Sequence, residues 1–255
     1  MSTTFTLGIL ETGRPPEALE EEYGSYPQLF ADMLCIEAPE WDFRAYRVNE
    51  GEFPFTLDEC DAWLVTGSKH GVYDDLDWIE ELKEFLEEAY EEGIPLVGIC
   101  FGHQILAEAL GGSAVKSRRG WGLGVQSYEV TEDGKALFPE ATEFSLNTFH
   151  QDQVVEIPES AKVLAKSEFC PYAALSYGDR ALSFQGHPEF DRAFTKALVE
   201  NRRGEVLTDE LADAALSTLD EKTDNDQLAQ IIVKFIEDRA GKSGSGGDKA
   251  EGPSA

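Results

Sequence analysis

The segment from Ile94 to Gly112, IPLVGICFGHQILAEALGG, constrains the fold of this chain more than any other part of it. It opens with a short apolar run, Pro95 to Ile99, which is typical of a strand buried on both faces of a parallel sheet. The apolar residues that follow repeat at helical spacing and end at a glycine pair. The segment therefore predicts a strand that passes directly into a helix, with Cys100 at the turn.

The spacing Gly98-x-Cys100-x-Gly102 is that of a nucleophile elbow, a sharp turn that presents a side chain above the sheet edge. A thiol at this place lies beside the first free N–H groups of a helix, whose partial positive charge favours the thiolate. A lone cysteine in an apolar segment is more often a small buried hydrophobe. The flanking glycines and the change from strand to helix favour a nucleophile here.

Other apolar patterns place this elbow in a larger sheet. Strands are predicted over 5–10, 43–48 and 62–65, and helices over 26–36 and 77–92. This alternation predicts an α/β fold with a doubly wound, mostly parallel sheet.

After Gly112 the pattern changes to short strand-like runs separated by turns, with a hairpin signal at 177–180. We expect an antiparallel β layer appended to the parallel sheet. Helical patterns return after Phe190. The predicted organisation is a single domain over residues 1–240, followed by a disordered tail over 241–255, where no apolar residue is larger than alanine.

Composition limits the possible partners. The 255 residues carry 50 Asp and Glu against 21 Lys and Arg, a net charge of −29. Such a surface repels phosphate backbones and anionic lipid, so neither nucleic acid nor a membrane is an expected partner. No apolar run approaches the ~20 residues that span a bilayer. The four cysteines have no paired spacing, so we expect free thiols and a cytoplasmic protein.

A cysteine nucleophile needs a base, usually histidine, and that base usually needs an orienting group. Of the four histidines, His187 is placed best, because it follows a strand and Glu189 can reach its far ring nitrogen. His70 and His103 are interpreted as surface or core residues. Cys100 and His103 have a ligand-like spacing, but no second pair exists, so no zinc site is predicted.

Several motifs together resemble a known family. GICFGHQ, the downstream QGHPE and the upstream TGS loop are similar to the class I, triad-type glutamine amidotransferases, which have a flavodoxin-like, three-layer fold. The runs VTGSKHGVYDD, GWGLG and HQDQV most resemble the standalone branch, which is similar to the glutaminase domain of GMP synthase and includes γ-glutamyl peptidases. The resemblance covers residues 5 to 203, and residues 204–240 match no motif.

The resemblance implies a Cys-His-Glu triad of Cys100, His187 and Glu189, as nucleophile, general base and acid, and orienting group. It implies an oxyanion hole at Phe101 and near Gly67 or Ser68, where synthase-linked members often have Gly-Gly-Pro in place of Gly67-Ser68-Lys69. It implies no metal or organic cofactor.

The resemblance also implies a substrate pocket. Gln104 would help to hold the α-amino acid end of the substrate, and the segment with Phe149, His150, Gln151 and Asp152 would line the same pocket. Other candidates for the pocket wall are Trp121, Tyr73 and residues 169–172, each of which could equally be a core aromatic. Arg118 and Arg119 could meet a substrate carboxylate or simply be solvated.

The expected reaction is hydrolysis of the γ-amide of glutamine or of a γ-glutamyl compound through a thioester on Cys100. If ammonia leaves, the protein feeds a synthase partner, since the chain has no ATP-binding P-loop signature; if an amino acid or amine leaves, it is a γ-glutamyl hydrolase. Two alternatives are a non-catalytic binding module and a cysteine-elbow chaperone or protease. Neither would need His187 and Glu189.

Overall fold

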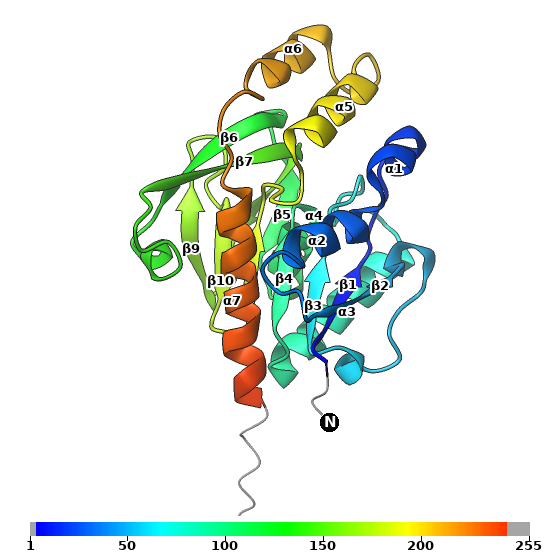
Figure 1. Cartoon of the computed structure of the whole chain (residues 1–255), viewed down its shortest axis with the longest axis vertical. Coiled ribbons are helices and arrows are strands. Elements are labelled where there is room, and N and C mark those ends of the chain that lie inside the picture. The colour runs from blue at the N-terminus through cyan, green and yellow to red at the C-terminus, as the bar shows by residue number, and fades with distance from the viewer. Residues whose placement is uncertain (1–3, 244–255) are drawn as a thin grey trace, which may run out of the picture.

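A nine-stranded sheet in the order β2-β1-β3-β4-β11-β10-β9-β6-β7 forms the centre of the molecule (Figure 1). The structure is a computed structural model that describes residues 4–243. One half of the sheet is parallel and consists of β2 (Asp42–Tyr46), β1 (Thr6–Leu10), β3 (Ala62–Val65), β4 (Leu96–Ile99) and β11 (Ala181–Phe184).

The antiparallel half continues from β11 in the same sheet. It consists of β10 (Ala174–Tyr177), β9 (Ala161–Lys166), β6 (Gly122–Val130) and β7 (Glu143–His150). A separate two-stranded sheet pairs β5 (Ser113–Lys116) with β8 (Asp152–Glu156). The predicted α/β fold is thus confirmed, and the antiparallel strands mainly extend the parallel sheet at its edge.

Helices cover both faces of the parallel half because its side chains alternate between them. In β3, Leu64 packs on the face with α2 (Tyr26–Leu34) and α7 (Asn225–Ser243), whereas Val65 packs on the face with α3 (Asp77–Glu92) and α4 (Phe101–Ala109). The result is a three-layer arrangement of helices, sheet and helices. Fully buried aliphatic side chains line both interfaces between the sheet and its helices.

Two more helices and a short third one surround the end of the sheet where the parallel strands finish. The two helices are α5 (Arg192–Arg202) and α6 (Asp209–Ser217), and the short one is α1 (Glu17–Tyr23). Helix α1 lies in a polar stretch of the sequence that shows no helical pattern. Figure 1 shows α5 and α6 above one end of β6 and β7. Apolar contacts hold the pair there, through Leu123, Val199, Leu207, Ala212 and Ala215.

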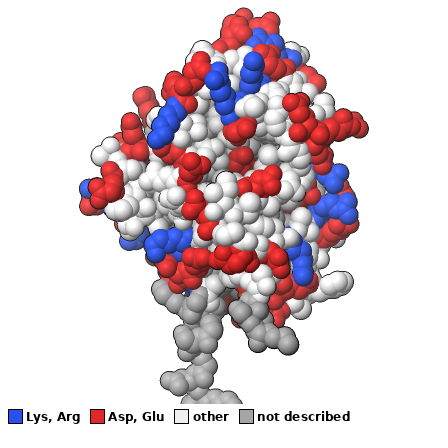
Figure 2. Space-filling view, viewed as in Figure 1, with Lys and Arg blue, Asp and Glu red and all other residues white. Residues whose placement is uncertain are grey.

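The remaining elements are short 3-10 helices at Val48–Glu50, Leu57–Glu59 and Asp133–Ala136. Helix α7 runs to Ser243, three residues into the segment predicted to be a tail; residues 244–255 lie outside the described part of the chain. Acidic side chains spread over the face in Figure 2, with Lys and Arg in smaller groups. No helix within residues 4–243 is long and apolar enough to cross a membrane.

Candidate active site

Cys100 sits on a strained turn between β4 and α4. Its φ of 57° and ψ of −103° make it the one non-glycine residue with positive φ in residues 4–243. The two elbow glycines allow this turn: a Cβ on Gly98 would collide with the carbonyl oxygen of Gly102, and one on Gly102 with that of Val65. Backbone strain of this kind, of order 1–3 kcal/mol, is characteristic of functional sites.

His187 and Glu189 form a buried pair. His187 Nδ1 lies 2.7 Å from Glu189 Oε1, and the two residues are 3% and 7% exposed. Because a carboxylate can only accept, Nδ1 carries the proton and donates it to Glu189. The other ring nitrogen, Nε2, is buried and has no hydrogen-bond partner among the described residues.

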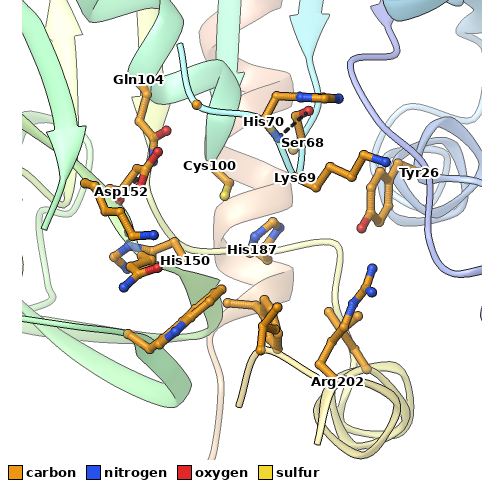
Figure 3. A pocket seen from close by; sticks show the side chains of 18 of the residues that line it. Tyr26, Ser68, Lys69, His70, Cys100, Gln104, His150, Asp152, His187 and Arg202 are labelled. Atoms are coloured by element: carbon orange, nitrogen blue, oxygen red, sulfur yellow. Dashed lines mark hydrogen bonds between the residues drawn. The ribbon is translucent and has the colours of Figure 1, made fainter. Parts of the chain in front are cut away.

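The sulfur of Cys100 points towards the ring of His187 (Figure 3). Gly67 lies beside both residues: a Cβ built there would lie 3.1 Å from His187 Cε1 and 3.7 Å from Cys100 Cβ. Burial by itself lowers the pKa of His187, but the charges of Glu189 and Cys100 outweigh burial and raise that pKa to about 10 from its ordinary 6.5. The imidazole is therefore held in its protonated form beside the Cys100 sulfur.

The segment that carries His187 is anchored by backbone contacts. The His187 N–H donates to the Asn147 carbonyl (2.9 Å), and the side-chain amides of Asn147 (2.9 Å) and Asn225 (2.8 Å) both donate to the Phe190 carbonyl. The Phe190 ring stacks on the imidazole, with centroids 4.0 Å apart and planes 2° apart. The position of the imidazole is thus set by strand β7, helix α7 and an aromatic stack.

Thr12, after β1, holds the loop after β3 in place. Its hydroxyl lies 3.0 Å from the Thr66 carbonyl oxygen and 3.1 Å from that of Gly67, and its own carbonyl accepts from the Ser68 hydroxyl (2.7 Å). The Ser68 side chain thus anchors the loop after β3 to the loop after β1. On the other side, Phe101 occupies the first helical position, where the N–H has no acceptor within the helix.

Gln104, His150 and Asp152 lie together on one side of Cys100 (Figure 3). The Gln104 side-chain amide donates to the Asp152 carbonyl oxygen (2.9 Å) and to Gln185 Oε1 (3.1 Å), and its own oxygen takes part in neither contact. His150 Nδ1 lies 3.0 Å from the same carbonyl of Asp152, and burial lowers its pKa to about 4. Burial raises the pKa of Asp152, whose Oδ2 accepts from the Tyr73 hydroxyl (2.9 Å).

A cleft of about 680 Å³ joins these groups. Of the residues predicted from the sequence, Gly67, Ser68, Cys100, Gln104, Phe149, His150, Gln151, Asp152 and His187 line it, as do Tyr73 and Trp121. Glu189 lies behind His187. Residues 169–172 and the exposed pair Arg118 and Arg119 are not part of the lining.

Sequence reasoning missed other residues of the cleft. Tyr26, Arg202 and Phe190 come from α2, α5 and the loop after His187, and Lys69 and His70 follow Ser68. His70 was interpreted as a surface or core residue, yet it lies at the cleft, with Nδ1 3.2 Å from Asp74 Oδ2. By contrast, His103 is a core residue bonded to the Ser183 hydroxyl (2.7 Å). The sequence offered a signal for only two of these residues, because Lys69 follows the predicted Ser68 and Phe190 follows the predicted Glu189.

Known proteins resemble this chain in both sequence and structure. The family model Glutamine amidotransferase class-I matches residues 42–202. A glutamine amidotransferase-like protein of Schizosaccharomyces pombe is 32% identical over 245 residues, which are 91% of this chain and 98% of that protein. Gamma-glutamyl peptidase 3 of Arabidopsis thaliana is 32% identical over 227 residues, 86% of this chain and 90% of that protein.

A glutamine amidotransferase of Thermotoga maritima has a similar structure, with a TM-score of 0.73 at 21% identity over 93% of this chain and 98% of that one. A glutamine amidotransferase of Methylobacillus flagellatus is also similar, with a TM-score of 0.74 at 20% identity over 100% of this chain and 99% of that one. At these identities the likeness concerns the fold.

Proposed function

Because this chain belongs to the class I glutamine amidotransferase family, we propose that it hydrolyses the γ-amide of glutamine or of a γ-glutamyl compound, with Cys100 as nucleophile. One observation carries the proposal. The unpartnered Nε2 of a buried His187–Glu189 pair faces a cysteine on a strained elbow, at the base of an open cleft.

In the proposed first step, the Cys100 sulfur attacks the γ-carbonyl carbon, and the new S–C bond forms as the carbonyl oxygen becomes an oxyanion. The N–H of Phe101 and an N–H of the Gly67–Ser68 loop would stabilise this oxyanion, an arrangement typically contributing ~3 kcal/mol per donor. The C–N bond then breaks, and the leaving nitrogen takes a proton from His187 Nε2.

In the second step, His187 takes a proton from water, and the hydroxyl attacks the γ-glutamyl thioester. The C–S bond breaks, glutamate leaves, and the thiolate and imidazolium are restored. The raised pKa of His187 suits both steps, since an imidazolium beside the sulfur stabilises the thiolate before attack and carries the proton that the leaving group needs.

Release of an amino acid or amine is the second candidate outcome. The cleft volume falls within the roughly 300–1,000 Å³ of sites that hold drug-sized ligands and exceeds what glutamine alone would fill. The match to gamma-glutamyl peptidase 3 along 90% of that protein supports the same outcome. If ammonia is the product, a synthase partner is required to use it.

A substrate panel tests the proposal. Glutamine, a γ-glutamyl dipeptide, a γ-glutamyl amine and a glutathione conjugate are each incubated with wild type, Cys100→Ala and His187→Ala, and glutamate and ammonia are measured. Cys35→Ala, which removes an exposed thiol, is the matched control. We expect turnover with wild type and the control only, and intact-mass spectrometry should detect a γ-glutamyl group on Cys100 after rapid quenching.

Turnover that persists in Cys100→Ala or in His187→Ala would exclude this mechanism. Unchanged turnover in His187→Ala would favour a cysteine-elbow protein that uses another histidine. Binding of these compounds without release of either product would instead identify a non-catalytic module. Ammonia from glutamine alone would favour the amidotransferase, and preference for a dipeptide or amine would favour the hydrolase.

A further inference from the structure

The cleft has two chemically different walls on either side of Cys100 (Figure 3). One wall carries Gln104, His150 and Asp152, which come from α4, β7 and β8. The opposite wall carries Lys69, Tyr26 and Arg202, which come from the loop after β3, from the first turn of α2 and from the end of α5.

The proposed reaction gives these walls different tasks. Gln104 and Asp152 are the residues that the family resemblance implies for the acyl end of the substrate. With the acyl group held there, the scissile C–N bond would lie above the sulfur, and the leaving group would extend away from that wall. The wall with Lys69, Tyr26 and Arg202 is therefore the one that a leaving group would meet.

The charge of the cleft is opposite to that of the protein. Acids outnumber bases 50 to 21 in the chain, yet the cleft is lined by four basic residues, Arg14, Lys69, Lys116 and Arg202, and by two acids, Asp74 and Asp152. Two of the bases serve acids already present. Arg14 lies within 4 Å of Glu11, Glu20 and Glu50. Lys116 lies opposite Asp152 in the β5–β8 register, and its charge acts to lower the pKa of that carboxyl.

The other two bases remain available for a ligand. Lys69 is exposed and has no acidic partner among the described residues. Arg202 Nη1 lies 3.1 Å from Oε2 of the exposed Glu205, which leaves the other donors of the guanidinium unused by that contact.

Tyr26 supplies a neutral donor between them. Its ring is held by Phe190 and Phe194, with centroids 5.9 Å and 6.4 Å away, and its hydroxyl has no hydrogen-bond partner within residues 4–243. Burial raises the pKa of Tyr26, so the hydroxyl keeps its proton and can donate it. Two cations and one hydroxyl that line the same wall are a donor set for a carboxylate.

We propose that Lys69, Tyr26 and Arg202 form a subsite for a carboxylate on the leaving group, and that the preferred substrates are γ-glutamyl amino acids or peptides with a free carboxyl end. This inference rests on the proposed function. The step itself is unchanged: the amide C–N bond breaks, the nitrogen takes its proton from His187, and the departing amino acid keeps its carboxylate on this wall.

The test compares two substrates that differ only in that charge, γ-glutamyl-alanine and γ-glutamyl-alaninamide. We expect wild type to show a kcat/KM at least about tenfold higher for the acid, equivalent to about 1.4 kcal/mol of selectivity. The ratio should fall to within about threefold of one in Lys69→Met/Arg202→Gln and decrease in Tyr26→Phe. It should also shrink at high salt, which screens partly exposed charges.

Arg118→Gln is the matched control, because this exposed arginine lies outside the cleft, and it should keep the wild-type ratio. Lys69→Met alone serves if the double variant does not fold, since its side chain is exposed and unpaired. Cys100-dependent turnover with a wild-type ratio near one, or a ratio that survives in these variants, would overturn the subsite alone. Absence of any Cys100-dependent turnover would overturn the proposed function as well.

Discussion

Nδ1 of His187 lies 2.7 Å from Oε1 of Glu189, and only Pro188 separates the two residues in the chain. Both side chains are almost wholly enclosed, so water screens their interaction little. The pair directs the free Nε2 of the imidazole towards Cys100, and four predictions start from this pair and from the parts of the fold that support it.

Replacement of the carboxylate should separate orientation from binding. In Glu189→Gln the amide cannot stabilise the imidazolium and can favour the wrong tautomer. We expect kcat for the best substrate of the panel to fall about 10²-fold or more, with KM changed little, in steady-state assays. Glu168→Gln, at an exposed site, is the control. A kcat within twofold of wild type would show that Glu189 does not orient the base.

Because His103 is buried, we expect the folded protein to lose stability in acid. Burial lowers its pKa to about 3 from 6.5, so below pH 6.5 the unfolded chain binds a proton that the folded one does not. The contribution of neutral His103 to the free energy of unfolding is complete above pH 6.5 and is lost as pH falls towards 3. At pH 5 the loss is about 2 kcal/mol.

Urea unfolding at pH 7.5 and pH 5 measures this effect. The decrease in the free energy of unfolding between the two pH values should be about 2 kcal/mol smaller in His103→Asn than in wild type. Ser183→Ala removes the same hydrogen bond but keeps the histidine, so it should retain the full decrease. Equal decreases in wild type and His103→Asn would contradict the lowered pKa.

The elbow glycines should tolerate no side chain. In Gly98→Ala the new methyl group would collide with the Gly102 carbonyl in a layer without free space, so we expect destabilisation of at least about 1–3 kcal/mol and loss of turnover. Gly111→Ala is the comparison, because its φ of 95° is also unfavourable but no atom lies within 4 Å of the new Cβ. Thermal unfolding and activity assays of both variants test this expectation. A fully active Gly98→Ala would mean that the elbow can relax to accommodate a side chain.

Arg203 should hold the α5–α6 pair against the cleft. Its guanidinium lies 3.0 Å from Glu200, 3.2 Å from Asp209 and 2.8 Å from Asp213. Because Arg202 is the preceding residue, we expect Arg203→Met to raise KM for a γ-glutamyl dipeptide and to lower the melting temperature. The difference in melting temperature from wild type should diminish at high salt. Arg119→Met, an exposed change outside the cleft, should show neither effect, and an unchanged KM in Arg203→Met would separate this network from the substrate wall.

Local patterns determined much of the fold and part of the site. The run from Ile94 to Gly112 predicted β4, the turn and α4, since a buried strand and an amphipathic helix each leave a period in the sequence. His187 and Glu189 could be proposed because they follow a strand and stand two residues apart. The fact that the antiparallel strands extend the same sheet, with β11 parallel to β4, was not predictable, because pairing joins segments distant in the sequence.

By itself, then, the sequence determined the α/β fold, the elbow at Cys100 and the candidate base, all of which depend on spacing within short segments. Only the tertiary structure decided what faces them. Tyr26, Lys69 and Arg202 come from three separate elements, and no period or motif relates them until the fold brings all three to one cleft, with Tyr26 packed on Phe190. The chemistry at the sulfur was therefore accessible from local pattern, whereas the wall that would meet the leaving group required the folded chain.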